Sequence, residues 1–157
     1  MPKIFLDENG FAQFEEAIVR AKQRLADSAA AKGRAVEGNT NAWHDNADFD
    51  IAKDAEIAAI SEIEHLANSR DKIVMVIKGD NRTVADIGDS IEIQLNSLPR
   101  SSKFKLTANY TSGDGEISIN SPMGSAVYMK KVGDMFSYTV GDRIMKGKLI
   151  GLLPDLS

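Results

Sequence analysis

A helical spacing of apolar residues dominates the first part of the chain. Asp7 is suited to cap a helix, because its carboxylate can accept a hydrogen bond from a free amide of the first turn. The apolar positions that follow at intervals of three and four are Phe11, Phe14, Ile18, Ala21 and Leu25. This spacing is typical of a coiled-coil seam or of one face of a helical hairpin. The next seam positions are the weaker Ser28, Lys32 and Ala35, so we expect this helix to project away from its packing partner.

A second helix is predicted after a turn at Gly38-Asn39-Thr40-Asn41. It begins near Ala42 or Asn46 and ends at Arg70. Its seam consists of Phe49, Ala52, Ala59, Ile63 and Leu66. Glu56 interrupts this seam, and Ile57 and Ile60 flank it. Short alanine side chains on both helices allow close approach. The first half of the chain therefore predicts an antiparallel helical hairpin with roughly 30 residues in each arm.

From residue 73 the apolar period changes from helical spacing to two. Five or six short strands are predicted, in the segments 73–77, 90–95, 103–107, 116–120, 135–140 and 144–152. Between them, Pro122 suits the first turn of a short helix and Ser121 suits its cap. The pattern predicts an α+β protein of two domains. Residues 1–74 form an antiparallel coiled-coil hairpin, and residues 75–157 form an antiparallel sheet with one short helix.

Composition narrows the class of protein. The 157 residues carry 19 basic and 23 acidic side chains, a net charge of -4, which disfavours a duplex-DNA binder that neutralises phosphates. The absence of cysteine excludes disulfides and thiolate metal sites, and two histidines leave little room for a zinc site or a Ser-His-Asp enzyme. We find no signal peptide and no apolar run of the roughly 20 residues that a membrane helix needs. We therefore expect a cytoplasmic protein.

The acidic excess belongs to the helical half. Residues 1–76 hold 9 basic and 14 acidic side chains, whereas residues 77–157 hold 10 and 9. Four of the acids gather near the predicted tip of the hairpin, and they are Asp45, Asp48, Asp50 and Asp54. One interpretation is an ordinary acidic helix start, which the helix dipole favours. The other is a carboxylate cluster that binds a divalent cation, because hard cations choose oxygen ligands.

A basic series along the first helix also allows two interpretations. Its members are Arg20, Lys22, Arg24, Lys32 and Arg34. Such a series is usually a solvated helix face, but it is also suited to steer a nucleic acid strand along the hairpin.

Three segments, in this order, carry a family resemblance. Asn9-Gly10-Phe11 precedes the first helix, and Asp45-Asn46-Ala47-Asp48-Phe49 follows the predicted turn. The segment 117–126 reads I-S-I-N-S-P-M-G-S-A and continues to Lys130-Lys131-Val132-Gly133-Asp134. Together they resemble the Gre family of bacterial transcript-cleavage factors, GreA and GreB. That family has Glu-Asn-Ala-Glu-Tyr at the tip of its hairpin and I-S-x-x-S-P-x-G-x-A…K-x-V-G-D in its second domain.

The resemblance implies an FKBP-like C-terminal domain that docks on RNA polymerase, and a hairpin that enters the polymerase's secondary channel. The tip carboxylates would help the polymerase's own active site to hold Mg²⁺ and to cut backtracked nascent RNA at its 3′ end. The factor would thus be an accessory protein, not an enzyme by itself. The residues assigned in this way are Asp45 and Asp48 at the metal, Ser121, Pro122, Met123 and Gly124 at the polymerase, and Arg24, Lys32 and Arg34 facing RNA.

The tip departs from the family pattern Gly-Asp-x-x-Glu-Asn. The first acid falls on Ala42, which has no ligand atom, and the second falls on Asp45, which is shorter by one methylene. A shorter side chain reaches less far toward the metal ion, and a misplacement of about 1 Å can lower a rate about a hundredfold. An alternative is therefore a divergent homologue that occupies the same channel and regulates or inhibits the polymerase without efficient cleavage.

Two further hypotheses come from other classes of protein. A prolyl isomerase would need an aromatic pocket, for which the sheet half offers Phe104, Tyr110, Tyr128, Phe136 and Tyr138. A self-associating scaffold would use the stripe of Phe11, Phe14 and Ile18 to join two copies and not two arms of one hairpin. We expect a monomer and leave a dimer open.

Overall fold

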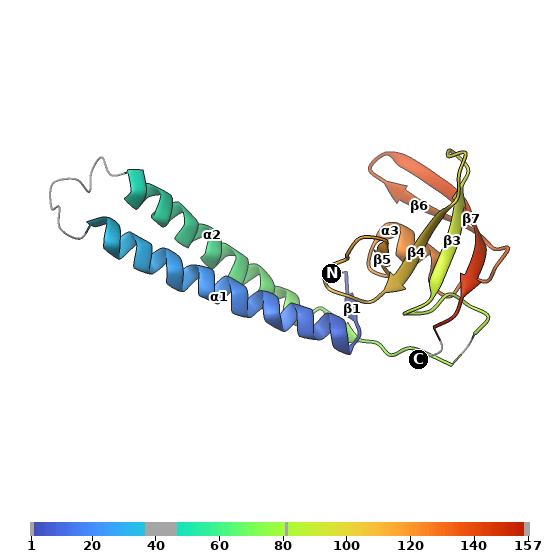
Figure 1. Ribbon diagram of the computed structural model, residues 1–157, viewed down its shortest axis with the longest axis horizontal. Coiled ribbons are helices and arrows are strands. Elements are labelled where there is room, and N and C mark those ends of the chain that lie inside the picture. The colour runs from blue at the N-terminus through green and yellow to red at the C-terminus, as the bar shows by residue number, and fades with distance from the viewer. Residues whose placement is uncertain (1, 37–46, 81, 156–157) are drawn as a thin grey trace. The chain divides into compact units, whose positions relative to one another are not determined.

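The computed structural model describes residues 2–36, 47–80 and 82–155. Its chain divides into two compact units. One unit holds Phe14–Ile73, and the other holds Pro2–Gln13 together with the chain from Val74 onward. The predicted fold class, an α+β protein with a helical hairpin followed by a sheet and a short helix, is confirmed (Figure 1). Within the described ranges, no helix has the length and apolar character needed to cross a membrane.

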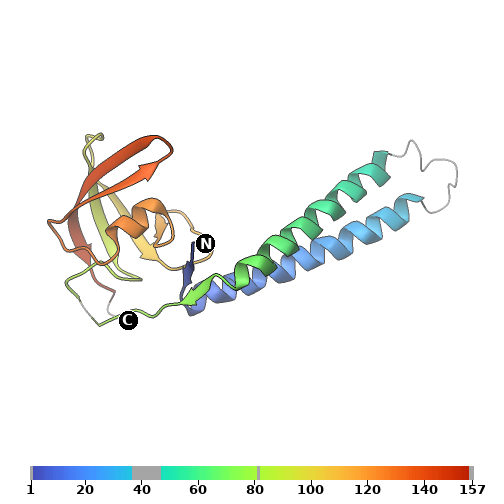
Figure 2. The same ribbon diagram turned by 180° about the vertical axis from the view of Figure 1, so that it is seen from behind.

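The hairpin consists of α1 (Glu8–Val36) and α2 (Ala47–Arg70), which run side by side in both views (Figure 1, Figure 2). Asp7 caps α1 as predicted, since its Oδ1 accepts a hydrogen bond of 2.7 Å from the backbone N–H of Gly10. The predicted seams are confirmed by burial, and their buried members are Phe14, Ala21, Ala52, Ala59 and Leu66. The predicted end of the second helix at Arg70 is also confirmed. The predicted turn and the start of that helix before Ala47 lie outside the described residues.

The expectation that the seam fails after Leu25 is wrong. Ser28 is buried, and its hydroxyl donates to the backbone oxygen of Arg24 at 2.7 Å. One turn further, Lys32 forms an ion pair of 3.1 Å with Glu56, the residue that interrupts the seam of α2. The Glu56 side chain is only 20% exposed. The two polar interruptions therefore meet each other and continue the seam toward the end of α1 and the start of α2.

A five-stranded sheet forms the core of the second unit. Its strands are β3 (Ser90–Leu95), β4 (Ser102–Thr107), β5 (Glu116–Ser118), β6 (Met135–Val140) and β7 (Arg143–Leu153), in the order β5-β4-β3-β7-β6. Alternate residues point into the core, and Ile91, Ile93 and Leu149 are almost completely buried there. The register pairs Ile91 with Phe104 on one side and with Leu152 on the other.

The predicted all-antiparallel sheet is wrong at one edge. β5 runs parallel to β4, with Lys105 paired to Glu116 and Thr107 to Ser118. Apolar alternation determines which face of a strand is buried, but it carries no information about the direction of the neighbouring strand. The chain therefore gave no sign of the parallel edge.

Short elements complete this part of the chain. Strand β1 (Ile4–Leu6) pairs with β2 (Ile73–Met75) in a separate two-stranded sheet. At three residues β1 is too short for an alternating pattern, and it was not predicted. Helix α3 (Pro122–Val127) packs on the sheet through Val127, which is fully buried.

Replacing the ion pair in the hairpin seam tests its role. We expect Lys32→Leu combined with Glu56→Leu to leave the free energy of unfolding equal or to raise it by about 1 kcal/mol, because apolar residues would fill the seam. Lys32→Ala alone leaves the Glu56 carboxylate without this partner, and we expect a loss of about 1–2 kcal/mol. Urea unfolding followed by far-UV circular dichroism measures both changes.

A matched control is Arg20→Ala, which removes the exposed Arg20–Glu16 pair on the same helix. Exposed pairs contribute little, so we expect a change below about 0.5 kcal/mol. If Lys32→Ala were no more harmful than this control, the seam would not depend on the ion pair.

Candidate functional site

The segment that carries the longest family resemblance forms a turn and the start of α3. Ser121 is the N-cap that the sequence predicted: its hydroxyl accepts a hydrogen bond of 3.1 Å from the N–H of Gly124. The same hydroxyl donates to the backbone oxygen of Ser118 at 2.6 Å. Pro122 occupies the first turn, where its missing N–H costs nothing. The Ser-Pro sequence thus has a local structural reason.

Gly124 is required by a close approach of two backbone segments. It is buried in α3, and a Cβ atom at this position would lie 1.8 Å from the backbone oxygen of Ser118. Gly10, in the first segment of the resemblance, is in a similar position, because a Cβ there would lie 2.1 Å from the oxygen of Ala108. Both glycines allow contacts that no other residue permits without a backbone shift.

The four residues assigned to polymerase binding therefore divide into two pairs. Ser121 and Gly124 build the turn. Pro122 is exposed, and Met123 is half-buried with its sulfur 3.5 Å from the hydroxyl of Tyr138. Pro122 and Met123 are the members of this set whose side chains are available for contact with a partner. The assignment itself stays a prediction.

An open groove lies beside the other end of α3. Its volume is about 620 Å³, and its walls come from α3, the residues after it, β6 and β7. Tyr128, Met135 and Phe136 supply apolar surface, while Lys130 and Lys146 supply positive charge. A smaller cavity of about 300 Å³ is also lined by Ser125 and Tyr128. The sequence analysis named Tyr128 and Phe136 as candidates for an aromatic pocket, but it missed the two lysines, which are 16 positions apart and become neighbours only through the fold.

The environment of Tyr128 changes the acidity of its phenol. Burial raises the pKa of Tyr128 above its ordinary value near 10, and the negative charge of Asp86 raises it further. Its phenol therefore stays protonated at neutral pH and can donate a hydrogen bond to a group in the groove.

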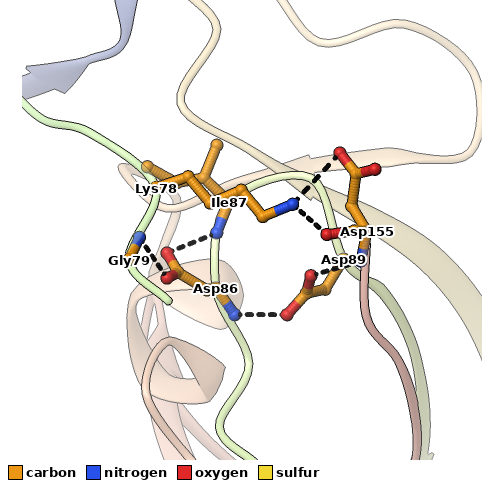
Figure 3. A network of polar contacts seen from close by, with 6 residues as sticks. All are labelled: Lys78, Gly79, Asp86, Ile87, Asp89 and Asp155. Carbon is orange, nitrogen blue, oxygen red and sulfur yellow. Dashed lines mark hydrogen bonds and ion pairs between the residues drawn. The ribbon is translucent and has the colours of Figure 1, made fainter. Parts of the chain in front are cut away.

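Two buried carboxylates shape the loop that precedes β3 (Figure 3). Asp86 and Asp89 are only 3% and 2% exposed. Asp86 accepts hydrogen bonds of 2.7 Å from the backbone N–H groups of Gly79 and Ile87, and Asp89 accepts one of 3.0 Å from the N–H of Asp86. These bonds compensate the loss of water around the carboxylates.

The same network holds the C-terminal segment. Asp89 accepts a hydrogen bond of 2.8 Å from the N–H of Asp155. Lys78 donates to the backbone oxygen of Asp155 and forms an ion pair of 3.5 Å with its carboxylate (Figure 3). Each acid in this group faces backbone N–H groups or Lys78. The network therefore ties the loop before β3 to Asp155 and does not form an open ligand site.

The predicted metal residues are only partly described. Asp48 lies in the first turn of α2 and is exposed, whereas Asp45 and Ala42 lie outside the described residues. In the described ranges, no cluster of three or more His, Cys, Asp or Glu side chains is arranged to hold a metal ion. The pairing of Asp45 with Asp48 stays a prediction.

The predicted RNA-facing residues lie on α1. Arg24 forms an ion pair with Glu62, and Lys32 forms one with Glu56, so both basic groups join the two arms of the hairpin. Arg34 is exposed in the last turn of α1. The structure thus gives Arg24 and Lys32 a structural function, and contact with RNA stays a prediction for all three.

Comparison with known proteins gives likenesses at the level of solved structures. No protein-family model matches the chain, and no curated protein matches it. A structure of the transcription factor Gfh1 is 18% identical, with a TM-score of 0.46 over 97% of this chain and 99% of that one. The GreA factor homolog 1 (Gfh1) of Thermus thermophilus is 17% identical, with a TM-score of 0.43 over 97% and 99%. A GreA/GreB elongation factor from Nitrosomonas europaea is 15% identical, with a TM-score of 0.39 over 98% and 100%.

Substitutions in the turn before α3 separate its structural residues from its surface. We expect Ser121→Ala to lower the free energy of unfolding by about 1 kcal/mol through loss of the cap. Gly124→Ala should cost about 3 kcal/mol, because its methyl group would overlap the oxygen of Ser118. Thermal unfolding measures both. The exposed Ser125→Ala in the same helix is the control, and a Gly124→Ala protein as stable as this control would contradict the close approach.

The raised pKa of Tyr128 predicts a stability change in alkali. A group whose pKa is higher in the folded state contributes stability that is present below its unfolded pKa, here about 10, and lost as the pH rises through the folded pKa. We therefore expect the wild type to lose more stability above pH 10 than Tyr128→Phe does. Urea midpoints on either side of pH 10 measure this, and equal losses in the two proteins would contradict the assignment.

Proposed function

We propose that this chain is a Gre-type transcription factor that acts on RNA polymerase. The observation that carries the proposal is the sequence of residues 117–126 with 130–134, which follows the pattern I-S-x-x-S-P-x-G-x-A…K-x-V-G-D. The segments Asn9–Phe11 and Asp45–Phe49 occur in the order that the family has. The hairpin of two long helices supports the same proposal, because such a hairpin can enter a channel of another protein.

The construction of the hairpin suits insertion into a narrow channel. A hairpin inside a channel must keep its two helices together and must remain thin. Among the described residues, the pairs Glu15–Arg70, Arg24–Glu62 and Lys32–Glu56 join the helices at three levels. The seam uses short residues such as Ala21, Ser28, Ala52 and Ala59, which let the helix axes approach closely.

The proposed cleavage activity rests on Asp45 and Asp48. Mg²⁺ commonly takes one or two protein carboxylates and completes its shell with water and phosphate oxygens. An exposed carboxylate at Asp48, with Asp45 three positions earlier in the sequence, would suit an ion that the polymerase also holds. When bound there, Mg²⁺ would activate water and stabilise the leaving oxygen in phosphodiester hydrolysis.

Docking on the polymerase is assigned to the sheet unit. Pro122 and Met123 present side chains next to the turn that Ser121 and Gly124 build. A rigid turn loses little conformational freedom on binding, which favours a small contact surface. We infer that the exposed part of this turn contacts the polymerase.

A cleavage assay tests the proposed activity. A stalled, backtracked polymerase complex with labelled RNA is incubated with saturating factor and Mg²⁺, and the RNA length is followed. We expect wild type to shorten the RNA, and Asp45→Asn or Asp48→Asn to lower the rate about tenfold to a hundredfold through loss of a metal ligand. Asp54→Asn, an exposed acid further along α2, is the matched control and should cleave like wild type.

The second candidate function is regulation of the polymerase without efficient cleavage. Ala42 favours this function, because the family pattern has an acidic residue at the position where this chain has an alanine without a metal-ligating atom. If wild type leaves the RNA intact and Ala42→Asp produces cleavage, the regulator hypothesis holds. If wild type already cleaves and Asp45→Asn abolishes the activity, it fails.

Binding is measured separately from cleavage. We expect Pro122→Glu to weaken association with core polymerase at least tenfold, since it places a charge on the proposed contact surface without removing the Ser121 cap. Thr139→Glu, at an exposed position of β6, is the control for added charge. Fluorescence anisotropy of labelled protein gives both affinities. Equal binding by wild type and Pro122→Glu would exclude this surface.

A further inference from the structure

We propose that the chain self-associates through α2, which pairs antiparallel with α2 of a second copy. The proposal does not depend on the proposed function. It begins with a row of side chains that the hairpin seam does not use, namely Lys53, Ile57, Ile60 and Glu64. Their spacing of four, three and four places them on one stripe of the helix. All four are exposed, and Ile57 and Ile60 retain 55% and 41% of their surface.

The row is distinct from the intramolecular seam. At 3.6 residues per turn it lies about 130° around α2 from the buried Ala52, Ala59 and Leu66. It also lies on the opposite flank from Glu62, which pairs with Arg24 of α1. The stripe of Phe11, Phe14 and Ile18, which the sequence offered as a dimer surface, is occupied inside the hairpin, with Phe14 fully buried.

The flank of α1 on the same side of the hairpin carries several short residues. The pairs Lys32–Glu56 and Arg24–Glu62 set the register of the two helices, which brings Ala26, Ala29 and Gly33 level with the row. These residues are exposed and short, and a Cβ added at Gly33 would meet no atom within 4 Å. Short residues on this flank of α1 therefore leave the row on α2 accessible to a partner helix.

The charges at the two ends of the row select the occupant and its direction. The row is symmetric in residue number, so an antiparallel two-fold pairing centred between Ile57 and Ile60 puts each Ile57 opposite Ile60 of the other copy. The same pairing puts Lys53 opposite Glu64, twice. A parallel pairing would put Lys53 against Lys53 and Glu64 against Glu64, which is unfavourable. In the described ranges, Lys53 and Glu64 form no ion pair within the chain. This complementarity favours a second copy of the same helix as the partner.

The expected dimer is weak. A stable interface buries about 1,200–2,000 Å² in total, and one row of four residues provides a surface below the low end of that range. We expect a dissociation constant of tens of micromolar, about 10–100 µM. Association should therefore appear on raising the protein concentration.

Sedimentation equilibrium across this concentration range tests the surface. We expect wild type to pass from monomer to dimer, and Ile57→Ser combined with Ile60→Ser to weaken association at least tenfold. Ile51→Ser is the matched control, because Ile51 is 67% exposed on the opposite flank of α2. Far-UV circular dichroism checks that each variant keeps its helices. A wild type that remains monomeric up to about 1 mM, or a control that weakens association equally, overturns the proposal.

Charge exchange tests the direction of the pairing. Lys53→Glu alone and Glu64→Lys alone place like charges opposite each other, and we expect each to weaken the dimer about threefold to tenfold. The double variant Lys53→Glu with Glu64→Lys reverses both charges and restores the antiparallel pairs, so its association should return to the wild-type level. A double variant that stays as weak as the single variants overturns the antiparallel arrangement.

Discussion

The hairpin depends on close contact between two helices whose fully buried positions are mostly small. Phe14 and Leu66 are buried at one end of the seam, and Ile18, Leu25 and Ile63 are half-buried. The other buried apolar positions are the small Ala21, Ala52 and Ala59. Such small residues contribute little burial each, but they let the backbones approach. Where even alanine is absent, Lys32 and Glu56 meet across the seam and prevent either charge from lying there alone. The contact between the two helices is therefore not interrupted at this level, because the polar residue of one helix lies opposite the polar residue of the other.

In the sheet unit, the residues that resemble the Gre family and the residues that the fold requires are partly the same. Ser121 caps α3, and Gly124 and Gly10 each lie against a backbone oxygen that no side chain could approach. The fold alone gives a reason for these residues at their positions. The functional content of the resemblance therefore rests more on Pro122, Met123 and the tip aspartates than on the length of the matching segment.

The sequence predicted the hairpin, the strands and the cap of α3 because each depends on local periodicity or on hydrogen bonds between residues a few positions apart. It failed where the answer depended on a second segment. The parallel pairing of β5 with β4 and the end of the α1 seam are two such cases. The candidate site divides in the same way. The position of Asp48 near a helix start could be predicted from the local pattern, whereas the groove around Tyr128 could not, since Lys130 and Lys146 meet only in the folded chain.

By itself, the sequence determined the class of fold, the excess of acid in the helical half and the order of segments that suggests a transcription factor. Only the tertiary structure decided which charged side chains form ion pairs between the two helices. Arg24 and Lys32 read as a solvated or RNA-facing series until Glu62 and Glu56 are placed opposite them. Ile57 and Ile60 read as flanking the seam until the seam is complete without them. The physical reason is that a side chain's environment is set by its neighbours in space, and these come from another helix whose register no local pattern encodes.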